Sequence, residues 1–183
     1  MPIPSGVSWS GPVEYSVVTG GQTIAGGTYS DLYMDNTSGT DVANGDITIT
    51  NSVSVLASGT FNMDTFRLIN STATFTNNGT IESQNTSTTP VPTGLTWGGT
   101  IILDNTTTGQ TVPAGTYNNL TLGGSSGTVI YSAANTITVN GTLTTNLGTS
   151  TLDMGTRQLL GTFTPVNNGT VMKENGWNPT ITL

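Results

Sequence analysis

A ten-residue stretch near the start of this chain occurs again 88 residues later. Residues 2–11, PIPSGVSWSG, return as residues 90–99, PVPTGLTWGG, so that Trp9 and Trp97 occupy equivalent positions. The same offset relates residues 21–24 to 109–112 and residues 27–29 to 115–117. A repeat of this length indicates a chain built from similar structural units rather than from one unique core.

The repeat also sets the expected domain boundaries. Farther along the chain the offset drifts, yet residues 77–81 still match residues 167–171, and residues 177–183 match residues 97–103. We therefore predict a first β repeat unit at residues 1–88, a second at 89–176 and the closing strand of a partial third at 177–183. Residues 83–89 are rich in Ser, Asn, Thr and Pro and have the composition of a linker between the units.

Short segments in which polar and apolar residues alternate predict β-strands along the whole chain. They are residues 13–17, 46–50, 52–56 and 72–76 in the first copy, and residues 117–122, 136–140 and 142–144 in the second. Period-2 alternation with β-branched residues suits a strand with one buried face. Asn-Gly pairs between the segments, such as Asn44-Gly45, Asn78-Gly79 and Asn140-Gly141, are typical of turns because Asn and Gly tolerate positive φ. Helical periodicity is not sustained anywhere over the roughly 10–12 residues that a helix needs.

Two all-β architectures fit this pattern. The first is a tandem-duplicated parallel β-solenoid, with coils of roughly 20–25 residues, about four per unit and about eight in the chain. At ~4.8 Å per stacked strand its body would be on the order of 40 Å long. The alternative is two tandem antiparallel β-sandwiches, each of seven or eight strands. We predict the solenoid.

Composition excludes several classes of function. Only 7% of the residues are charged, and the net charge is −7 with three basic residues, Arg67, Arg157 and Lys173. A nucleic-acid surface needs clustered cations, and so does docking on an anionic membrane. No apolar run approaches the roughly 20 residues that span a bilayer. The chain has no cysteine, hence no disulfide and no thiolate metal site.

Catalysis finds little support in the residue types. The chain has neither His nor Cys, Ser8 lacks the second glycine of a nucleophile elbow, and Lys173 is the only lysine. Paired carboxylates could cleave glycosides, and the candidates for that role are Glu14, Asp31, Asp35, Asp41, Asp46, Asp64 and Glu82. Their counterparts in the second copy are mostly neutral, for example Asn119, Gly123 and Ile102. We therefore predict a non-enzymatic protein without a catalytic residue, metal or cofactor.

Three further features have both a ligand interpretation and a structural one. Residues 35–41, with Asp46 nearby, offer oxygen ligands for Ca²⁺ but lack EF-hand spacing, so we favour Asx turns there. Thr-x-Thr strands raise the idea of ice binding, although the coils between them are irregular. Trp9, Trp97 and Trp177 could stack on a sugar, but recurrence at a repeat favours large apolar plugs at the joints.

The strings at residues 117–122, 137–143 and 152–156 resemble the repeats of right-handed β-helix passenger and adhesin domains on bacterial surfaces. They also resemble phage fibre and decoration proteins. The resemblance covers residues 20–82 and 108–172 and carries over no catalytic residue. It implies a structural or adhesive role rather than an enzymatic one.

We expect a structural protein of a virus particle, such as a phage capsid decoration (cement) or fibre component at the virion surface. Residues 1–5 have no basic and no apolar signal region, so we expect a product made without export. Its partners would be the capsid or neighbouring copies, for example in a trimer, with a surface glycan as a further partner. The edge strands 13–19 and 180–183 could pair with a neighbour. The alternatives are an exported bacterial adhesin or filament module, and a glycan-cleaving β-helix enzyme.

Overall fold

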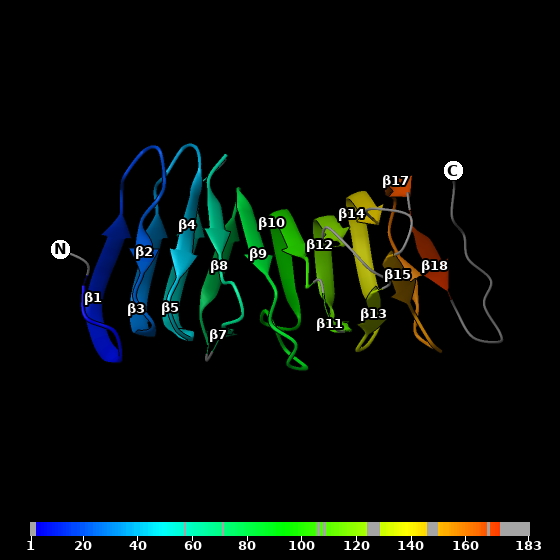
Figure 1. Cartoon of the computed structure of the whole chain (residues 1–183), viewed down its shortest axis with the longest axis horizontal. Coiled ribbons are helices and arrows are strands. Elements are labelled where there is room, and N and C mark those ends of the chain that lie inside the picture. Colours follow the sequence, from blue (N-terminus) through cyan, green and yellow to red (C-terminus); the bar gives the residue numbers. More distant parts are fainter. Residues whose placement is uncertain are drawn as a thin grey trace.

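The computed structural model is a β-solenoid whose strands stack side by side along one long axis (Figure 1). It describes residues 3–56, 58–70, 72–105, 107, 109–123, 129–145, 150–167 and 169–172. This part of the chain contains strands and no helix, so it also has no helix that could cross a membrane. Every strand pair in it is parallel, as stacked coils require. The solenoid prediction is confirmed, and the antiparallel sandwich pair is excluded.

The eighteen strands of the described residues fall into two sets of nine that match the two copies of the sequence. The first set is β1 (Val7–Tyr15), β2 (Thr23–Ile24), β3 (Gly27–Met34), β4 (Thr40–Ala43), β5 (Ile47–Val55), β6 (Thr60–Asn62), β7 (Leu68–Asn70), β8 (Thr74–Asn77) and β9 (Thr80–Ser83). The second set is β10 (Leu95–Leu103), β11 (Gln110–Val112), β12 (Gly115–Leu122), β13 (Val129–Ala133), β14 (Ile137–Thr145), β15 (Ser150–Asp153), β16 (Leu159–Leu160), β17 (Thr164–Asn167) and β18 (Thr170–Met172).

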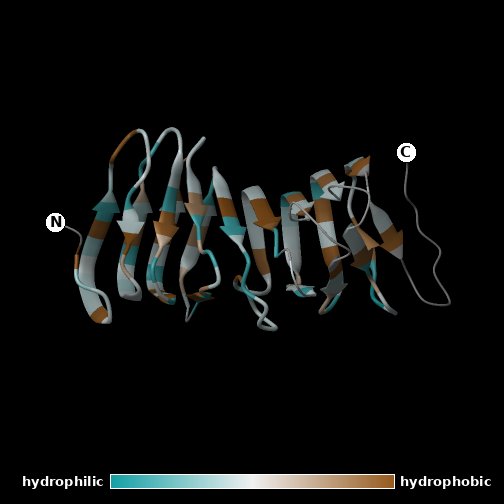
Figure 2. Ribbon diagram, in the orientation of Figure 1, coloured by the Kyte–Doolittle hydropathy of each residue, from teal (hydrophilic) through white to brown (hydrophobic). Residues whose placement is uncertain are grey.

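Each turn has short straight sides whose inward residues form the core. In β5, Ile47 and Ile49 point inward, the strand bends, and Val53 and Val55 then point inward. The alternation in β5 keeps its phase across the bend, with the exposed Asn51 at the bend, whereas in β3 the inward positions change from Tyr29 to Leu32 and Met34, and the register between the two strands shifts there by one residue. Phe61 of β6 completes the inner surface of this turn. Hydrophobic residues therefore alternate with polar ones along many of the strands, visible as bands of colour in Figure 2.

The second copy is displaced around the solenoid axis relative to the first. By sequence β10 is the equivalent of β1, and β1 lies in a five-stranded sheet with β3, β5, β7 and β8. In space β10 instead continues a nine-stranded sheet that begins with β2, β4, β6 and β9 and goes on through β12, β14, β16 and β17.

The displacement follows from the length of a turn. Register partners on adjacent turns lie 19 to 23 positions apart in the sequence, as Thr23 and Val42 do at one extreme and Asn119 and Thr142 at the other. The 88-residue sequence repeat is therefore longer than four turns, and the excess corresponds to one further side of a solenoid turn. It is not a whole number of turns, so equivalent strands of the two copies lie in different sheets.

The number of turns is slightly smaller than expected. The path of the nine-stranded sheet from β2 to β16 passes through eight strands, which makes seven steps and about seven turns rather than eight. A fourth turn ends at β9, and β10 stacks on it directly, with Thr100 beside Thr80 and Leu103 beside Ser83. The two repeat units therefore share one continuous sheet. The third unit, residues 177–183, lies outside the described residues.

Residues 83–89, predicted as a linker, run directly into a packed segment. Ser83 is the buried last residue of β9, residues 84–94 form no strand, and Pro90, Val91 and Pro92, which follow the predicted linker, are buried. Leu68 donates its backbone N–H to the Pro90 carbonyl. The segment accordingly completes a turn of the solenoid and does not separate two bodies.

Two local predictions were wrong. The first strand is Val7–Tyr15 rather than residues 13–19, because Val17 and Val18 belong to an exposed loop. Asn140-Gly141 is not a turn between strands but the bend inside β14, where the register with β12 shifts.

The other two Asn-Gly pairs lie between strands as predicted, but positive φ is not what requires Asn and Gly there. Neither Asn44-Gly45 nor Asn78-Gly79 has positive φ. Gly79 is required by close approach instead, because a Cβ there would meet the carbonyl oxygens of Leu56 and Gly59.

Candidate functional site

A row of threonines runs along the outside of the nine-stranded sheet. Register neighbours on successive turns are Thr40, Thr60, Thr80, Thr100, Asn119, Thr142 and Thr164. Each is followed in the chain by a more buried, inward-facing residue, so the row itself faces outward. Neighbouring strands in a sheet lie about 4.8 Å apart, which sets the spacing of the hydroxyl and methyl groups. We call these seven residues the threonine row.

Glycines immediately before the row allow the turns to stack. Gly39, Gly59, Gly79 and Gly99 precede the first four threonines at equal intervals. An added Cβ at Gly99 would fall on the carbonyl oxygen of Gly79, and one at Gly79 would lie 2.5 Å from that of Gly59. The Gly-Thr interval crosses the junction of the two copies unchanged. These evenly spaced Gly-Thr pairs are the sequence signal that would have revealed the threonine row, but the longer 88-residue repeat obscured them.

The row beside the threonine row is chemically mixed. Two residues farther along the same strands stand Val42, Asn62, Glu82, Ile102, Thr121, Thr144 and Val166. Ice binding calls for a regular Thr-x-Thr pair in every coil, and here only one position of the pair is regular. The face is therefore a polar, low-charge surface with a single periodic line.

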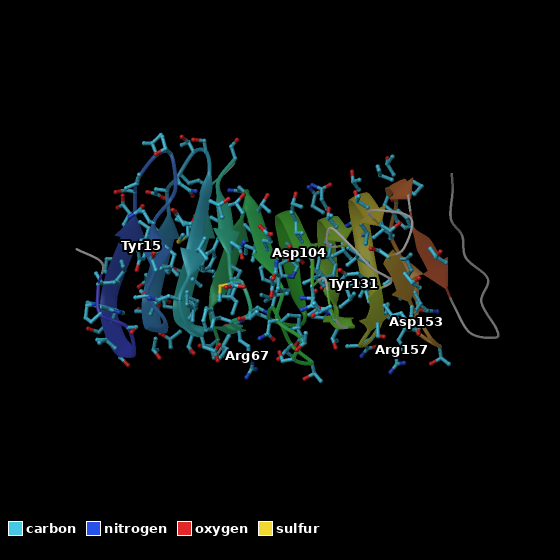
Figure 3. All side chains as sticks on the ribbon, viewed as in Figure 1. Tyr15, Arg67, Asp104, Tyr131, Asp153 and Arg157 are labelled. Carbon is cyan, nitrogen blue, oxygen red and sulfur yellow. The ribbon has the colours of Figure 1, made fainter. Side chains whose placement is uncertain are left out.

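Two carboxyl groups meet on this face in the middle of the molecule. The side chains of Glu82, in β9, and Asp104, just after β10, are close enough to hydrogen-bond when one of the two carboxyl groups is protonated. Burial, together with this bond and the negative charge of Asp104, raises the pKa of Glu82 to about 7. Asp104 Oδ2 accepts from Gln84 Nε2 at 3.1 Å, while the buried Oδ1 has no donor other than a protonated Glu82 among the described residues. Asp104 is labelled in Figure 3.

This pair does not have the geometry of a glycosidase. Retaining enzymes hold their carboxyl groups roughly 5–5.5 Å apart and inverting enzymes roughly 6.5–9.5 Å apart, with the sugar between them. Two carboxyl groups within hydrogen-bonding reach of one another, able to share a proton, stand closer together than either separation. Glu82 was among the sequence candidates, but Asp104 was not.

Two further acidic candidates, Asp31 and Asp46, lie away from this pair and accept hydrogen bonds from neighbouring residues. Asp31 is at a bend, where Ser52 Oγ, Ser30 Oγ and Asn51 Nδ2 donate to its carboxylate at 2.5, 2.8 and 2.6 Å. These bonds, led by that from Ser52, lower the pKa of Asp31. Asp46 Oδ1 accepts from the Arg67 backbone N–H at 2.9 Å. Both residues tie one turn to the next.

Asp41 is the exception, because it points into the core. Its Oδ1 accepts from the Gln22 backbone N–H at 2.8 Å, and its Oδ2 has no partner among the described residues. Burial raises the pKa of Asp41. No group of three or more acidic side chains that could hold a metal ion is found in the described part of the chain. Asp35, Asp41 and Asp46 are accordingly not gathered into such a group.

The remaining candidates are Asp35, Asp64 and Glu14. The backbone N–H of Asp35 donates to the Tyr15 carbonyl. Asp64 has φ of 50° in a tight turn, where its N–H donates to Asn62 Oδ1 at 2.6 Å. Glu14 lies exposed on β1. None of the three is brought into a shared site by these contacts.

The tryptophans that open the two copies are in different environments. Trp97 is fully buried and packs edge-to-face on Phe75, with ring centroids 5.5 Å apart and an interplanar angle of 78°. Trp9, on the terminal strand β1, is only partly buried. Each lies beside a buried tyrosine of the next turn, Tyr117 and Tyr29 respectively. The plug interpretation holds for Trp97, whereas Trp177 lies outside the described residues.

Each of these tyrosines donates its hydroxyl to a backbone carbonyl four residues earlier in the chain. Tyr29 Oη donates to the Ala25 carbonyl and Tyr117 Oη to the Pro113 carbonyl, both at 2.6 Å. Burial raises the pKa of both hydroxyls. The duplication thus repeats this structural contact.

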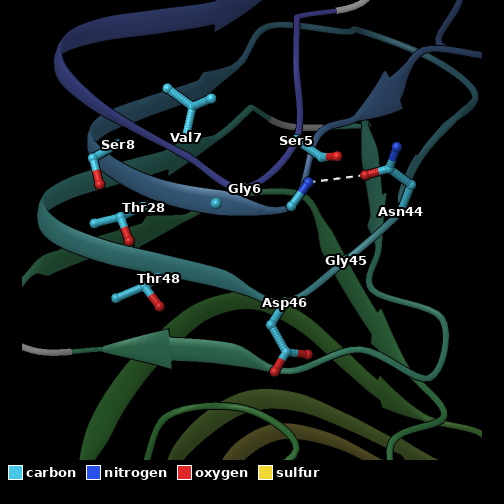
Figure 4. A pocket seen from close by; sticks show the side chains of 11 residues that line it. Ser5, Gly6, Val7, Ser8, Thr28, Asn44, Gly45, Asp46 and Thr48 are labelled. Carbon is cyan, nitrogen blue, oxygen red and sulfur yellow. Dashed lines mark hydrogen bonds between the residues drawn. The ribbon is translucent and has the colours of Figure 1, made fainter.

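Two hollows are found on the surface of the described part of the chain. A polar groove of about 430 Å³ lies at a glycine-rich bend of the first turns and is lined by Gly6, Gly26 and Gly45 and by the hydroxyl residues Ser8, Thr28 and Thr48, among others. Figure 4 shows it from close by. Gly26 donates its N–H to Asn44 Oδ1 at 2.9 Å, which closes that bend. A smaller hollow of about 190 Å³ lies beside Arg67, whose Nη2 donates to Thr89 Oγ1 at 3.2 Å. Neither contains the Glu82–Asp104 pair.

Comparison with known proteins adds no relative: no protein-family model, no curated protein and no solved structure matches the chain. What is established is the class, a parallel β-solenoid built by tandem duplication.

Proposed function

We propose that this protein is a non-enzymatic structural component of a virus particle, a decoration or fibre protein that lies on the particle surface and stabilises it. The observation that carries the proposal is the threonine row, a periodic outward-facing line that follows the longest sheet of the molecule. A rigid face that repeats at a fixed spacing can make the same contact several times along a regular partner, so that weak contacts add up.

The surface chemistry is consistent with such a role. The threonine row carries no charge, and the whole chain has only 13 charged residues, ten acidic and three basic. Contacts between short hydroxyl side chains and a partner depend on shape and hydrogen bonds. Their strength should therefore change little with salt, in contrast to binding by ion pairs.

A co-sedimentation experiment with purified candidate phage capsids tests the proposal. Wild-type protein should sediment with the particles and raise their melting temperature. Replacing Thr60 and Thr100 by Arg should abolish both effects, because two long charged side chains would interrupt the row. The matched control is Thr48→Arg with Thr28→Arg, which places the same charges on the five-stranded sheet.

The alternatives give different results in the same assay. Binding to bacterial cells or their glycans, with no binding to particles, would favour an adhesin of the bacterial surface. Equal binding by the row variant and the control would refute a role of this face. Cleavage of a polysaccharide that is lost in Glu82→Gln would favour an enzyme and contradict the proposal.

A further inference from the structure

The N-terminal end of the solenoid leaves residues uncovered that are buried in the second copy. Val7 is 37% exposed, and Ile3, Trp9 and Val13 are partly exposed. The residues at the equivalent positions of the second copy are Val91, Trp97 and Ile101, all at 0% exposure, and the half-buried Leu95. The difference arises because β10 is covered by β9, whereas β1 pairs with β3 alone among the described strands. This end of the molecule is visible in Figure 1.

At one position of this end, no contact among the described residues requires glycine. Gly99 must be glycine because an added Cβ would fall on the Gly79 carbonyl oxygen of the turn below. Its equivalent, Gly11, has no atom within 4 Å of the Cβ position and no positive φ. The steric reason for glycine at this position exists only when another turn is stacked on β1.

The other end of the molecule offers the matching surface. β10 stacks on β9 next to β8, and the second-copy equivalents of β8 and β9 are β17 and β18, since residues 77–81 match residues 167–171. β1 and β18 lie at opposite ends of the stack (Figure 1). The junction inside the chain is thus a template for a junction between chains.

We propose that the N-terminal end, formed by Ile3, Val7, Trp9, Gly11 and Val13, binds the β17–β18 end of a second copy, so that molecules stack head to tail. A contact between two different surfaces of this kind does not close on itself and builds open chains.

Two substitutions make this contact weaker than the internal junction. At the internal junction Thr100 donates its backbone N–H to the Gly79 carbonyl at 2.9 Å, whereas the equivalent residue at the N-terminal end, Pro12, has no N–H to donate. Ser10 replaces Gly98, which lies tightly against the Asn77 carbonyl. The association is therefore reversible.

Engineered cysteines test this arrangement, because the chain has none of its own. Glu82 and Ile102 are register neighbours across the internal junction, and their equivalents at the two ends are Met172 and Glu14. Adjacent strands lie about 4.8 Å apart, within the Cα separation that a disulfide spans. Glu14→Cys and Met172→Cys, mixed under oxidising conditions, should give a heterodimer at least tenfold more abundant than the homodimer of either variant alone. Cross-linking of Glu14→Cys with itself at equal efficiency, or no cross-linking at high micromolar protein, would overturn the proposal.

A second variant separates stacking from folding. Gly11→Val should leave the melting temperature unchanged, because its side chain meets open space, and should reduce the heterodimer at least tenfold. Val18→Ser, on an exposed loop valine, should leave the yield unchanged. Undiminished cross-linking with Gly11→Val would also count against the proposal. The outcome does not depend on particle binding, so the two proposals can fail separately.

Discussion

Replacing Trp97 by Ala should destabilise the protein by about 3–5 kcal/mol. The side chain is fully buried, and a buried tryptophan removes about 150–250 Å² from water, equivalent to roughly 4–6 kcal/mol at about 25 cal/mol per Å². Losing the edge-to-face contact with Phe75 adds about 0.5–1.5 kcal/mol. One effect acts the other way: Trp97 Nε1 is buried without a partner among the described residues, and its removal relieves about 1–3 kcal/mol.

The duplication supplies a matched control, because Trp9 occupies the same sequence position with only partial burial. Trp9→Ala should cost about 1–2 kcal/mol, since part of its surface already faces water. Urea unfolding followed by circular dichroism measures both free energies of unfolding, provided that the transition is two-state in each variant. Equal losses at the two positions would refute the argument that the internal junction buries what the N-terminal end exposes. Unchanged stability in Trp97→Ala would place this side chain at the surface.

Two further predictions concern the nine-stranded sheet. The pKa of Glu82 is about 7 in the folded protein against 4.5 as an ordinary value, so its contribution to stability is complete below about pH 4.5 and is lost as the pH rises to about 7. Because Glu82 is only half-buried, we discount the effect for solvent screening and expect about 1–2 kcal/mol. The free energy of unfolding of Glu82→Gln should lack this pH dependence. A pH profile of stability identical to that of the wild type would contradict the shared proton. Gly99→Ala should destabilise by about 2 kcal/mol or more while Gly11→Ala stays within about 0.5 kcal/mol, as thermal unfolding of the pair would show. A neutral Gly99→Ala would mean that the stacking at Gly79 is looser than the close approach of the two backbones implies.

Much of the fold could be predicted from local patterns. The alternation in residues 46–56 and 136–144 identified the inward residues of β5 and β14, because a strand with one buried face has a period of two. The repeated Trp9 and Trp97 located the starts of the two copies. Parallel stacking followed from the short interval between successive strands, which matches the coil of a solenoid. These properties depend on neighbours along the chain.

The candidate site could be predicted only in part. Glu82 was named as one acidic residue among seven, but nothing in the alternation of β9 indicates that Asp104 lies against it. Those two residues are far apart in the sequence, and they meet because one turn of the solenoid brings the next strand alongside. The threonine row was hidden for the same reason, although its evenly spaced Gly-Thr pairs were present in the sequence.

What the sequence determined by itself is the type of unit: strands with alternating faces, repeated in two copies that begin at Trp9 and Trp97. Only the tertiary structure decided how the copies join. The duplicated unit exceeds four turns by one further side, so β10 continues the sheet of β9 instead of the sheet of β1. That displacement buries Trp97, leaves its equivalent Trp9 partly exposed, and makes Gly99 necessary while Gly11 faces open space. The physical reason is that stacking follows the length of a turn, whereas the sequence repeat follows the length of the duplicated unit.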